Sequence, residues 1–299
     1  MVNLSLLQLF VKVAETGSIA AAARQLDIAP SIASRQISTL EHAFKTKLLI
    51  RTTRHLSLTQ AGQTLLEWAK PVTRGFEELT DELGAMQHRP SGVVRIASND
   101  YASATYLPDI LKKFCRKYPD VRVQLSTSTE PARLLDGEYD LALHAGRMPD
   151  VNLIGRKIRQ YRRVLCASPA YLARKGTPQQ VTDLAEHDCL THSPGERLNW
   201  SFEHKGQILT QAIQPYIEVD SYEVLRQLAT SGMGIARLSE SMVRAAFASG
   251  ELIELLPDHT CVYADGGLPA MWIIFADRRI LHRTRLLADF IATEMAKTT

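Results

Sequence analysis

A repeating pattern of apolar residues between positions 59 and 87 constrains this chain more than any other feature. Apolar side chains recur there at alternating steps of three and four residues, which is the spacing of one face of a long helix. The positions are Ala61, Leu65, Ala69, Val72, Phe76, Leu79, Leu83 and Met86. Over about 29 residues at 1.5 Å each, the helix would be roughly 43 Å long. Such a stripe calls for a partner helix in a homodimer, or for packing on the chain's own body.

This helix would separate a small N-terminal module from a larger body. Pro71 lies within it and predicts a kink, because proline cannot donate a backbone hydrogen bond to the Glu67 carbonyl. The segment after it, His-Arg-Pro-Ser-Gly, has the composition of a hinge. We therefore expect an N-terminal domain over residues 1–59, a linker and dimerisation helix over 60–87, a hinge over 88–92 and a body over 93–299.

The charge is distributed unevenly between these parts. The whole chain of 299 residues has a net charge of only +3, from 35 basic and 32 acidic residues. The first 60 residues contain seven basic and three acidic residues, a net charge of +4, so the remainder sums to −1. A basic module on a near-neutral body suggests that the module contacts a polyanion, although so small an excess also fits an ordinary solvated surface.

The first 45 residues predict three short helices. Apolar spacing indicates one over residues 4–15, Ser18 is placed to cap a second, and Pro30 begins a third that runs to about residue 43. In the third helix we expect an inward face of Ile32 or Ala33, Ile37, Leu40 and Phe44. The opposite face would present Ser31, Ser34, Arg35 and Ser38. Hydroxyls and arginine suit base reading in the major groove of DNA, while a plain three-helix bundle with a polar face fits equally well.

A basic hairpin follows the third helix. Residues 48–50 and 56–58 have short strand patterns, and the segment between them is Arg51, Thr52, Thr53, Arg54 and His55. Arginines at the tip of such a wing can enter the minor groove, where the phosphate potential is concentrated. A helix-turn-helix followed directly by a basic wing is more specific than either alone, and it predicts a module that binds double-stranded DNA.

Strands and helices alternate in the body, which is typical of a parallel, doubly wound α/β sheet. The patterns predict strands over 93–97, 121–126 and 140–144, with helices over 105–118 and 131–136 between them. Further strands at 164–168 and 270–276 would bound a second α/β unit, which includes a hairpin around Lys205 and Gly206. Such a chain forms a two-lobed clamp, with lobe I over about 93–163 and 270–299 and lobe II over about 164–269.

Three stretches rich in polar residues follow the predicted strands of lobe I. They are Ser98-Asn99-Asp100-Tyr101, Thr127-Ser128-Thr129 and Ala145-Gly146-Arg147. Ligands of open α/β sheets bind at the carboxyl ends of the strands. Hydroxyls, an amide and one arginine would suit a small polar or anionic molecule there, although loops are commonly polar without binding anything.

The N-terminal residues together resemble the winged helix-turn-helix of LysR-type transcriptional regulators, over nearly every patterned position from 4 to 66. The resemblance is carried by Phe10-x-x-Val13-Ala14-Glu15-x-Gly17-Ser18, Ala21-Ala22-Ala23-x-x-Leu26, Pro30-Ser31, Ser34-Arg35-x-Ile37-x-x-Leu40-Glu41, Leu48, Arg51-x-x-Arg54 and Leu58-Thr59-x-Ala61-Gly62. The chain departs from the family pattern at Asp27-Ile28, Lys45 and Leu49. The resemblance implies DNA contacts from Ser18, Pro30, Ser31, Ser34, Arg35, Ser38, Arg51, Thr52, Thr53 and Arg54.

The body resembles the effector domain of the same family, which is similar in fold to periplasmic solute-binding proteins. Matching residues include Val94-Arg95-Ile96, Tyr118-Pro119-x-Val121, Ala167-Ser168-Pro169-x-Tyr171-Leu172 and Gly232-x-Gly234-Ile235-Ala236. The resemblance implies that a small-molecule inducer lies between the two lobes and modulates DNA binding or promoter activation. The implied inducer contacts are Ser98, Asn99, Asp100, Tyr101, Thr127, Ser128, Thr129, Arg147, Trp200 and Ser221.

The sequence lacks common catalytic and cofactor motifs. It has no Gly-x-Ser-x-Gly, no His-Glu-x-x-His, no P-loop and no glycine-rich dinucleotide fingerprint, so we predict no enzyme activity and no cofactor. We also predict no metal site, because His187, Cys189 and His192 lack a fourth ligand. Cys166 and Cys189 are expected to be buried apolar residues rather than a redox switch, since nothing basic adjoins Cys189.

The composition and the start of the sequence also predict where the protein works. A chain that is 45% hydrophobic is not disordered, its start lacks the features of a signal peptide, and no segment reaches the roughly 18 apolar residues of a membrane span, so we expect a cytoplasmic protein.

The predicted fold class is α/β overall, with an all-α winged helix-turn-helix domain, a long linker helix and a two-lobed doubly wound α/β effector domain. We expect a homodimer or homotetramer on a palindromic operator, with RNA polymerase as a further candidate partner. The alternative is a cytoplasmic small-molecule-binding or enzymatic α/β protein with a helical protein-interaction head.

Overall fold

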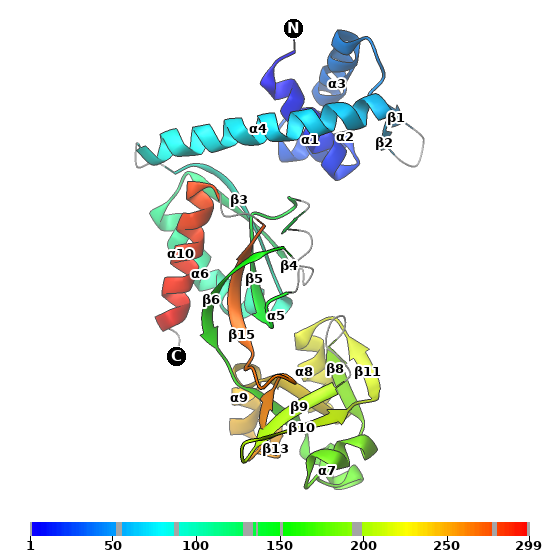
Figure 1. The fold of residues 1–299 in the computed structure, drawn as a ribbon, viewed down its shortest axis with the longest axis vertical. Helices are drawn as coiled ribbons and strands as arrows, with labels where there is room; N and C mark the ends of the chain where they lie inside the picture. The colour runs from blue at the N-terminus through cyan, green and yellow to red at the C-terminus, as the bar shows by residue number, and fades with distance from the viewer. Residues whose placement is uncertain are drawn as a thin grey trace. The chain divides into compact units, whose positions relative to one another are not determined.

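The chain divides into two compact units, Met1–His88 and Arg89–Thr299 (Figure 1). The division falls at the start of the expected hinge. The computed structural model describes residues 2–51, 56–86, 90–127, 134–135, 137–149, 152–192, 199–276 and 280–297, without the side chains of Arg51, Ala85 and Met86.

The first unit, called the head from here on, contains three short helices, a hairpin and one long helix. Its elements are α1 Leu4–Thr16, α2 Ile19–Gln25, α3 Pro30–Phe44, β1 Leu49–Arg51, β2 Leu56–Leu58 and α4 Gln60–Met86. The predicted starts of α2 and α3 are confirmed. The Ala21 amide donates to Ser18 Oγ at 3.3 Å, and Pro30 is the first residue of α3, where its missing N–H has no helical partner to lose.

One face of α3 is buried in the core of the head. Ala33, Ile37 and Leu40 are fully buried, so Ala33 and not Ile32 is the inward residue, and Ile32 is 50% exposed. The expectation that Phe44 faces inward is wrong, because its side chain is 45% exposed. Phe44 is the last residue of α3, and the chain turns away at Lys45, which has a φ of 52°.

A buried carboxylate attaches the hairpin to α3. Glu41 is 5% exposed, and its Oε1 accepts hydrogen bonds from the backbone amides of Leu48 at 3.0 Å and Leu49 at 3.3 Å. The Lys47 ammonium donates to Oε2 at 2.8 Å. Burial alone raises the pKa of Glu41, but the lysine and the two amides outweigh burial and bring the pKa below its ordinary value. Glu41 is therefore a charged acceptor that fixes where β1 begins.

The second unit, called the body, contains two lobes. Lobe I is built on a five-stranded sheet of order β4-β3-β5-β15-β6, with helices packed against it. Its elements are β3 Gly92–Ser98, α5 Asp100–Thr105, α6 Leu107–Lys117, β4 Val121–Thr127, β5 Leu141–Gly146, β6 Ile154–Gln160, β15 Ala270–Phe275 and α10 His282–Lys297. Phe114 of α6, Ile273 of β15 and Leu287 of α10 are buried in one core.

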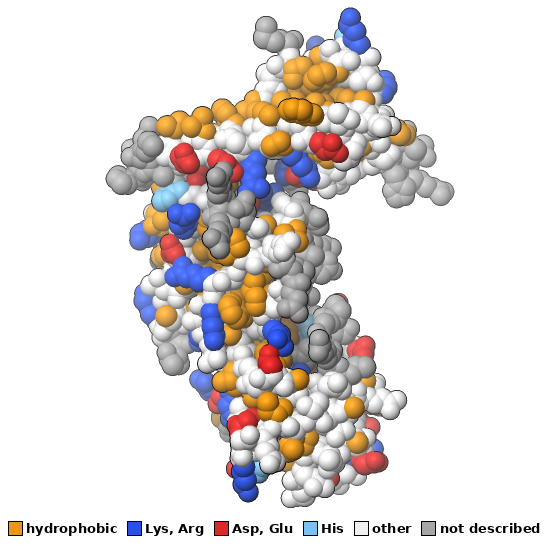
Figure 2. All heavy atoms as spheres, in the orientation of Figure 1, with side chains coloured by type: hydrophobic (Ala, Val, Ile, Leu, Met, Phe, Trp, Pro, Cys, Tyr) orange, Lys and Arg blue, Asp and Glu red, His pale blue; other side chains and the backbone are white. Residues whose placement is uncertain are grey.

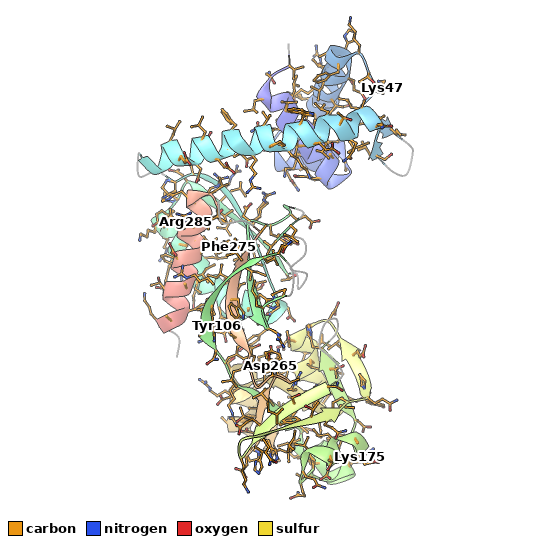
Figure 3. All side chains as sticks on the ribbon, in the orientation of Figure 1. Lys47, Tyr106, Lys175, Asp265, Phe275 and Arg285 are labelled. Carbon is orange, nitrogen blue, oxygen red and sulfur yellow. The ribbon has the colours of Figure 1, made fainter. Side chains whose placement is uncertain are left out.

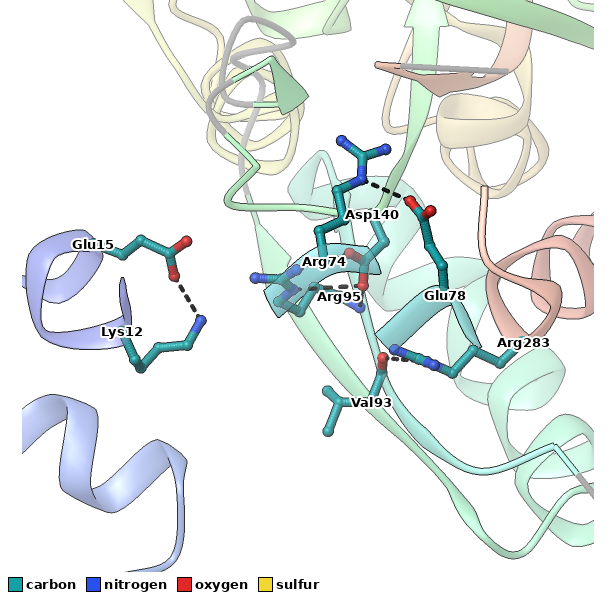
Figure 4. Close-up of polar contacts among 8 residues, drawn as sticks. All are labelled: Lys12, Glu15, Arg74, Glu78, Val93, Arg95, Asp140 and Arg283. Atoms are coloured by element: carbon teal, nitrogen blue, oxygen red, sulfur yellow. Dashed lines mark hydrogen bonds and ion pairs between the residues drawn. The ribbon is translucent and has the colours of Figure 1, made fainter. Parts of the chain in front are cut away.

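Side-chain bonds to the backbone hold the first strand of lobe I (Figure 4). Asp140, just before β5, accepts from the Arg95 amide at 2.7 Å and from the Arg95 guanidinium at 2.9 Å. Arg283 of α10 donates to the Val93 carbonyl at 3.0 Å. These contacts anchor β3 to β5 on one side and to α10 on the other.

Lobe II contains a five-stranded sheet of order β11-β8-β12-β7-β13 and a three-stranded sheet of order β10-β9-β14. Its strands are β7 Arg163–Ala167, β8 Cys189–His192, β9 Asn199–His204, β10 Gln207–Ala212, β11 Pro215–Val219, β12 Ile235–Ser239, β13 Ile253–Leu255 and β14 Thr260–Val262. Its helices are α7 Pro169–Lys175, the 3₁₀ helix η2 Val181–Glu186, α8 Tyr222–Thr230 and α9 Glu240–Ser249. The expected hairpin around Lys205 and Gly206 joins β9 to β10.

Two features of the body go beyond the sequence expectation. The sheets are mixed rather than parallel: β3 is parallel to β4 and β5, but β15 is antiparallel to β5 and β6, and β7 is antiparallel to β12. The reason is that β7 and β15 carry the chain from one lobe to the other and do not follow a helical crossover within a sheet. The helix expected over 105–118 is confirmed as α6 within two residues. Residues 100–105 form the separate helix α5, which was not predicted and whose Ala102 amide donates to Asn99 Oδ1 at 2.7 Å.

The chain passes between the lobes twice. Residues 161–162 join β6 to β7, and residues 263–269 join β14 to β15. The two connections lie side by side, because the Tyr161 amide donates to the Pro269 carbonyl at 3.1 Å. The predicted strands at 164–168 and 270–276, which bound lobe II, are confirmed as β7 and β15 within about one residue.

The Glu41 contacts generate a stability prediction for the head. Replacing Glu41 with alanine leaves two buried amides without their acceptor, which costs about 1–3 kcal/mol. We expect a lower midpoint for the head in thermal unfolding followed by circular dichroism. Because the pKa of Glu41 is lowered in the folded state, its stabilising effect exists above the ordinary glutamate pKa and is lost as the pH falls through the lowered value.

The matched control is Glu15→Ala, which removes a partly exposed ion pair with Lys12 inside α1. Such pairs contribute about 0–1 kcal/mol. Equal midpoints for Glu41→Ala and Glu15→Ala at neutral pH would contradict the anchoring role of Glu41.

Candidate functional site

The polar face of α3 is exposed. Ser31, Arg35 and Ser38 are exposed and Ser34 is half-buried, all opposite the buried face of Ala33, Ile37 and Leu40. Ser38 Oγ donates to the Ser34 carbonyl at 3.1 Å, so this hydroxyl bonds its own helix. The side of the helix that carries these residues is therefore free of the head's core and presents hydroxyls and a guanidinium.

The hairpin next to α3 is described only in part. β1 and β2 pair antiparallel, with Leu49 opposite Leu58, and Lys47 before β1 has a largely exposed side chain (Figure 3). Thr52, Thr53 and Arg54, which were predicted to contact DNA, lie outside the described residues, as does the side chain of Arg51. Of the other predicted contacts, Ser18 caps α2 with its hydroxyl and Pro30 opens α3.

The apolar seam of α4 has two halves with different environments. Ala61 and Leu65 pack against the core of the head, and Ala69 is buried. The later described positions, Val72, Phe76, Leu79 and Leu83, are each about half exposed, and Trp68 beside them is 73% exposed. Figure 2 shows hydrophobic side chains in a row along this helix. The second half of α4 thus carries a continuous exposed apolar stripe.

The predicted effector residues at the start of α5 join the two lobes. Asp100 Oδ2 of lobe I accepts from the Ser221 hydroxyl, which caps α8 of lobe II, and from the Glu223 amide at 3.2 Å. Burial alone raises the pKa of Asp100, but these donors outweigh burial, and the pKa lies below its ordinary value. Asp100 is therefore a charged acceptor at the N-terminus of α8, where a negative charge is stabilised.

Two buried oxygen atoms lie close to this contact between α5 and α8. Ser98 Oγ, on a residue 1% exposed, and Asp100 Oδ1 make no hydrogen bond within the part of the chain that the structure describes. Such groups are unusual in folded proteins and commonly bond to water or a ligand. The Asn99 side chain, in contrast, is used as the cap of α5.

The remaining predicted effector residues are dispersed. Thr127 is exposed at the end of β4, and Ser128 and Thr129 lie outside the described residues. Arg147 follows β5 and pairs with Asp265 at 2.8 Å. Trp200 is almost fully buried in a lobe II core, under the Arg237 guanidinium. The structure brings Ser98, Asn99, Asp100 and Ser221 together, and it leaves Trp200 inside lobe II.

A pocket open to solvent lies between the two lobes beside the first connection. Tyr106 of lobe I, which lines this pocket, is labelled in Figure 3. Lining residues from lobe I include Tyr101, Tyr106 and Arg159, and those from lobe II include Arg163 and Arg237. Of the residues predicted to contact an effector, Asn99 and Tyr101 line this pocket. Its arginines were not predicted, because they belong to strands far apart in the sequence.

Comparison with known proteins identifies both parts of the chain. Residues 4–63 match the family model described as "Bacterial regulatory helix-turn-helix protein, lysR family", and residues 87–296 match the model described as "LysR substrate binding domain". The regulator CrgA of Neisseria meningitidis is 35% identical over 291 residues, which cover 97% of this chain and 96% of CrgA. The chain belongs to the LysR family of transcriptional regulators.

Solved structures of LysR-type regulators share the fold of the whole chain. The structure of CrgA from Neisseria meningitidis has a TM-score of 0.60 at 34% identity and covers 99% of both chains. The full-length Vibrio cholerae virulence activator AphB has a TM-score of 0.64 at 25% identity and covers 98% of this chain and 99% of its own. These matches confirm the predicted family, fold class and regulatory function.

Two further findings bear on the LysR-type chain. No helix within the described ranges is both long enough and apolar enough to span a membrane. The same part of the chain holds no cluster of three His, Cys, Asp or Glu side chains that could bind a metal ion. Cys166 and Cys189 are buried as expected, and burial raises the pKa of each thiol to about 12.

The contact between the lobes generates a stability prediction. Asp100→Ala removes the acceptor of Ser221 and Glu223, and we expect the thermal midpoint of the body to fall by the equivalent of about 1–3 kcal/mol. Since the pKa of Asp100 is lowered on folding, this difference is present above an aspartate pKa of about 3.9 and shrinks as the pH falls through the lowered value. Differential scanning calorimetry at neutral and acidic pH measures both effects.

Asp109→Ala is the control, because Asp109 is an exposed acid in the first turn of α6. Its loss is expected to change stability by less than about 0.5 kcal/mol. A midpoint for Asp100→Ala equal to that of Asp109→Ala would rule out the contribution of the Asp100 contact.

Proposed function

We propose that this LysR-type regulator binds double-stranded DNA with α3 in the major groove and the β1–β2 hairpin beside it. The observation that carries the proposal is the division of α3 into a fully buried apolar face and an exposed face of Ser31, Ser34, Arg35 and Ser38. Arginine forms two parallel hydrogen bonds to guanine, and serine hydroxyls bond to bases or phosphates at close approach. Ser18 and Pro30 would contribute backbone contacts at the helix starts.

The basic residues of the hairpin would contact phosphates and the adjacent minor groove. We assign this role to Arg51, Thr52, Thr53 and Arg54 from the sequence. The exposed Lys47 ammonium, held beside β1 by its ion pair with Glu41, adds positive charge next to them. Phosphate contacts of this kind make affinity strongly dependent on salt and carry no sequence preference themselves.

The protein would act as a homodimer paired along the second half of α4. The stripe of Val72, Phe76, Leu79 and Leu83 supports this, because four half-exposed apolar residues at coiled-coil spacing are stabilised by burial against a second copy. A dimer would place two heads on one palindromic operator. A tetramer would need a second interface in addition.

The effector would bind at the strand ends of lobe I, where Ser98, Asp100 and Ser221 meet. The unbonded buried oxygens of Ser98 and Asp100 support a polar ligand that donates hydrogen bonds. Asn99, Tyr101, Thr127, Ser128, Thr129 and Arg147 complete the proposed surroundings. Trp200 is omitted because its ring lies within the core of lobe II. A ligand that changes the fit of the lobes would alter DNA binding by a coupling of about 1–3 kcal/mol.

We further infer that the protein works in the cytoplasm and catalyses no reaction. The relatives named above are transcriptional regulators, and the sequence offers no nucleophile motif or cofactor fingerprint. A gel shift with the intergenic DNA beside its own gene tests DNA binding directly. Retardation of that fragment at a protein concentration that leaves random DNA free is the expected result, and equal affinity for both fragments would refute sequence-specific binding.

Arg35→Ala tests the role of α3. We expect the variant to lose about 1–3 kcal/mol of binding to the specific site and to accept a changed base at one position, because a bidentate guanine contact is removed. Titration of specific and random fragments by fluorescence anisotropy measures this. Thr39→Ala on the same helix is the control for folding. An equal loss of affinity on specific and random DNA would exclude base reading by Arg35.

Leu79→Glu tests the α4 interface. A charge in the centre of the apolar stripe should convert the dimer to a monomer and weaken operator binding, which sedimentation velocity and gel shift measure separately. Thr80→Glu adds the same charge at the neighbouring exposed position and should leave the dimer intact. A Leu79→Glu protein that still sediments as a dimer would show that the chains pair elsewhere.

A further inference from the structure

An apolar side chain lies on the exposed polar face of α3. Ile32, in the first turn of this helix, is 50% exposed, whereas the next residue, Ala33, is fully buried. Single exposed apolar residues are common on protein surfaces and carry no meaning by themselves. The meaning of Ile32 therefore depends on which side chains surround it and on what that face of the helix contacts.

Ile32 shares its side of α3 with Arg35. At 3.6 residues per turn, side chains three positions apart leave the helix roughly 60° from each other, whereas the adjacent residues Ser34 and Arg35 are roughly 100° apart. The Cβ atoms of such a pair are neighbours on the helix surface, about 5–6 Å from each other. Ser31, four residues before Arg35, is exposed on the same side. Ile32 is thus part of the face that the proposed function places in the major groove.

The fold of the head does not need an isoleucine at this position. The core contacts of α3 come from Ala33, Ile37 and Leu40, which are fully buried, and Ile32 does not belong to that core. Isoleucine is also a weaker helix former than alanine, because its branched Cβ loses rotational freedom in a helix. Neither packing nor helix propensity favours an exposed isoleucine here, which indicates a contact outside the chain.

The start of α3 is the part of the helix that would lie nearest to the bases. In helix-turn-helix proteins, the N-terminal residues of the second helix contact base edges in the major groove. Pro30 and Ser31, the residues before Ile32, are exposed and compact, so they leave room for the helix to approach the bases closely. An aliphatic side chain in this first turn is therefore placed to contact a base directly.

Thymine is the base that an aliphatic side chain distinguishes. In the major groove each base pair presents its own pattern of hydrogen-bond donors and acceptors, and thymine adds its apolar C5-methyl group. Contact between this methyl and an aliphatic side chain removes apolar surface of both from water, which is favourable. The branched Cβ of isoleucine also keeps its first side-chain torsion in one preferred rotamer within a helix, so little rotational freedom is lost on contact.

We propose that Ile32 reads a thymine of the operator by contact with its C5-methyl, one or two base pairs from the guanine that Arg35 contacts. The spacing follows from the helix, because side chains about 5–6 Å apart span one or two base steps of roughly 3.4 Å. This inference rests on the proposed function, since it requires α3 to lie in the major groove. It adds an apolar contact to the hydroxyls and the guanidinium of this face, and it makes each half-site depend on a thymine.

Replacing thymine with uracil in the operator tests the inference, because uracil lacks only the C5-methyl. The duplex is the segment of the intergenic DNA that the full-length protein protects, synthesised with uracil at one thymine position of both half-sites at a time. Titration by fluorescence anisotropy measures the affinity. We expect uracil at one position to weaken binding of the wild-type protein roughly fourfold for each half-site, which is the effect of one buried methyl group converted to affinity.

Ile32→Ala identifies the residue that contacts the methyl. We expect this variant to bind the thymine and uracil duplexes of that position with equal affinity, because the contact is already absent. Alanine is the strongest helix former, so α3 should remain folded, which an unchanged circular dichroism spectrum checks. Ile32→Val keeps the branched Cβ and should retain part of the preference for thymine. Ile50→Ala is the matched control, since Ile50 lies on β1 of the same head and is 49% exposed, and it should keep the full preference.

The outcomes separate this inference from the proposed function. A wild-type protein that binds its operator specifically, but binds the thymine and uracil duplexes equally at every position, overturns the inference and leaves the proposed function in place. A preference for thymine that is unchanged in Ile32→Ala and in Ile32→Val assigns the methyl contact to another residue and also overturns it. Equal binding of the operator and of random DNA by the wild type would overturn the proposed function, and this inference with it.

Discussion

The double passage of the chain between the two lobes is the constraint on which the body depends. Residues 161–162 and 263–269 connect the lobes, and the hydrogen bond from the Tyr161 amide to the Pro269 carbonyl keeps the two connections together. Two adjacent connections allow the lobes to rotate about one region and prevent them from separating. They also require β7 and β15 to enter their sheets antiparallel to a neighbour, and they bring Arg159 and Arg163 to the same small space.

A different constraint governs the head. Glu41 holds the start of the hairpin against α3 through two backbone amides, so the position of Leu48 and Leu49 relative to α3 is fixed. The apolar seam of α4 is then divided between two tasks. Its first half packs against the core of the head, while its second half remains exposed. Two identical heads on one paired helix would account for the symmetry of a palindromic operator.

Local sequence patterns predicted those helix starts, helix lengths and turns that depend on neighbouring residues. The Ser18 cap of α2, Pro30 as the first residue of α3, the length of α4 and the hairpin at Lys205 and Gly206 depend on neighbouring residues, and each agrees with the structure. Periodicity could not decide between Ile32 and Ala33, because both fit an inward face within one turn. It also placed Phe44 inside, although α3 ends there. The break at Tyr106 and the separate helix α5 depend on the Asn99 side chain as a cap, a signal present in the sequence and missed.

The features that the sequence did not predict depend on contacts between residues that are far apart along the chain. The pocket arginines come from three strands, and their convergence depends on the registers of β6 with β15 and of β7 with β12, which no local pattern contains. The family resemblance implied an inducer contact from Trp200, but this residue packs inside lobe II, where Arg237 covers its ring.

The central claim is that two copies of this LysR-type regulator, paired along α4, each insert α3 into a major groove of one operator. Hydroxyl-radical footprinting on the operator tests it most directly. The account predicts two protected segments related by a dyad, with centres a whole number of DNA turns apart on one face of the duplex. A single protected segment, or protection without dyad symmetry, would contradict it.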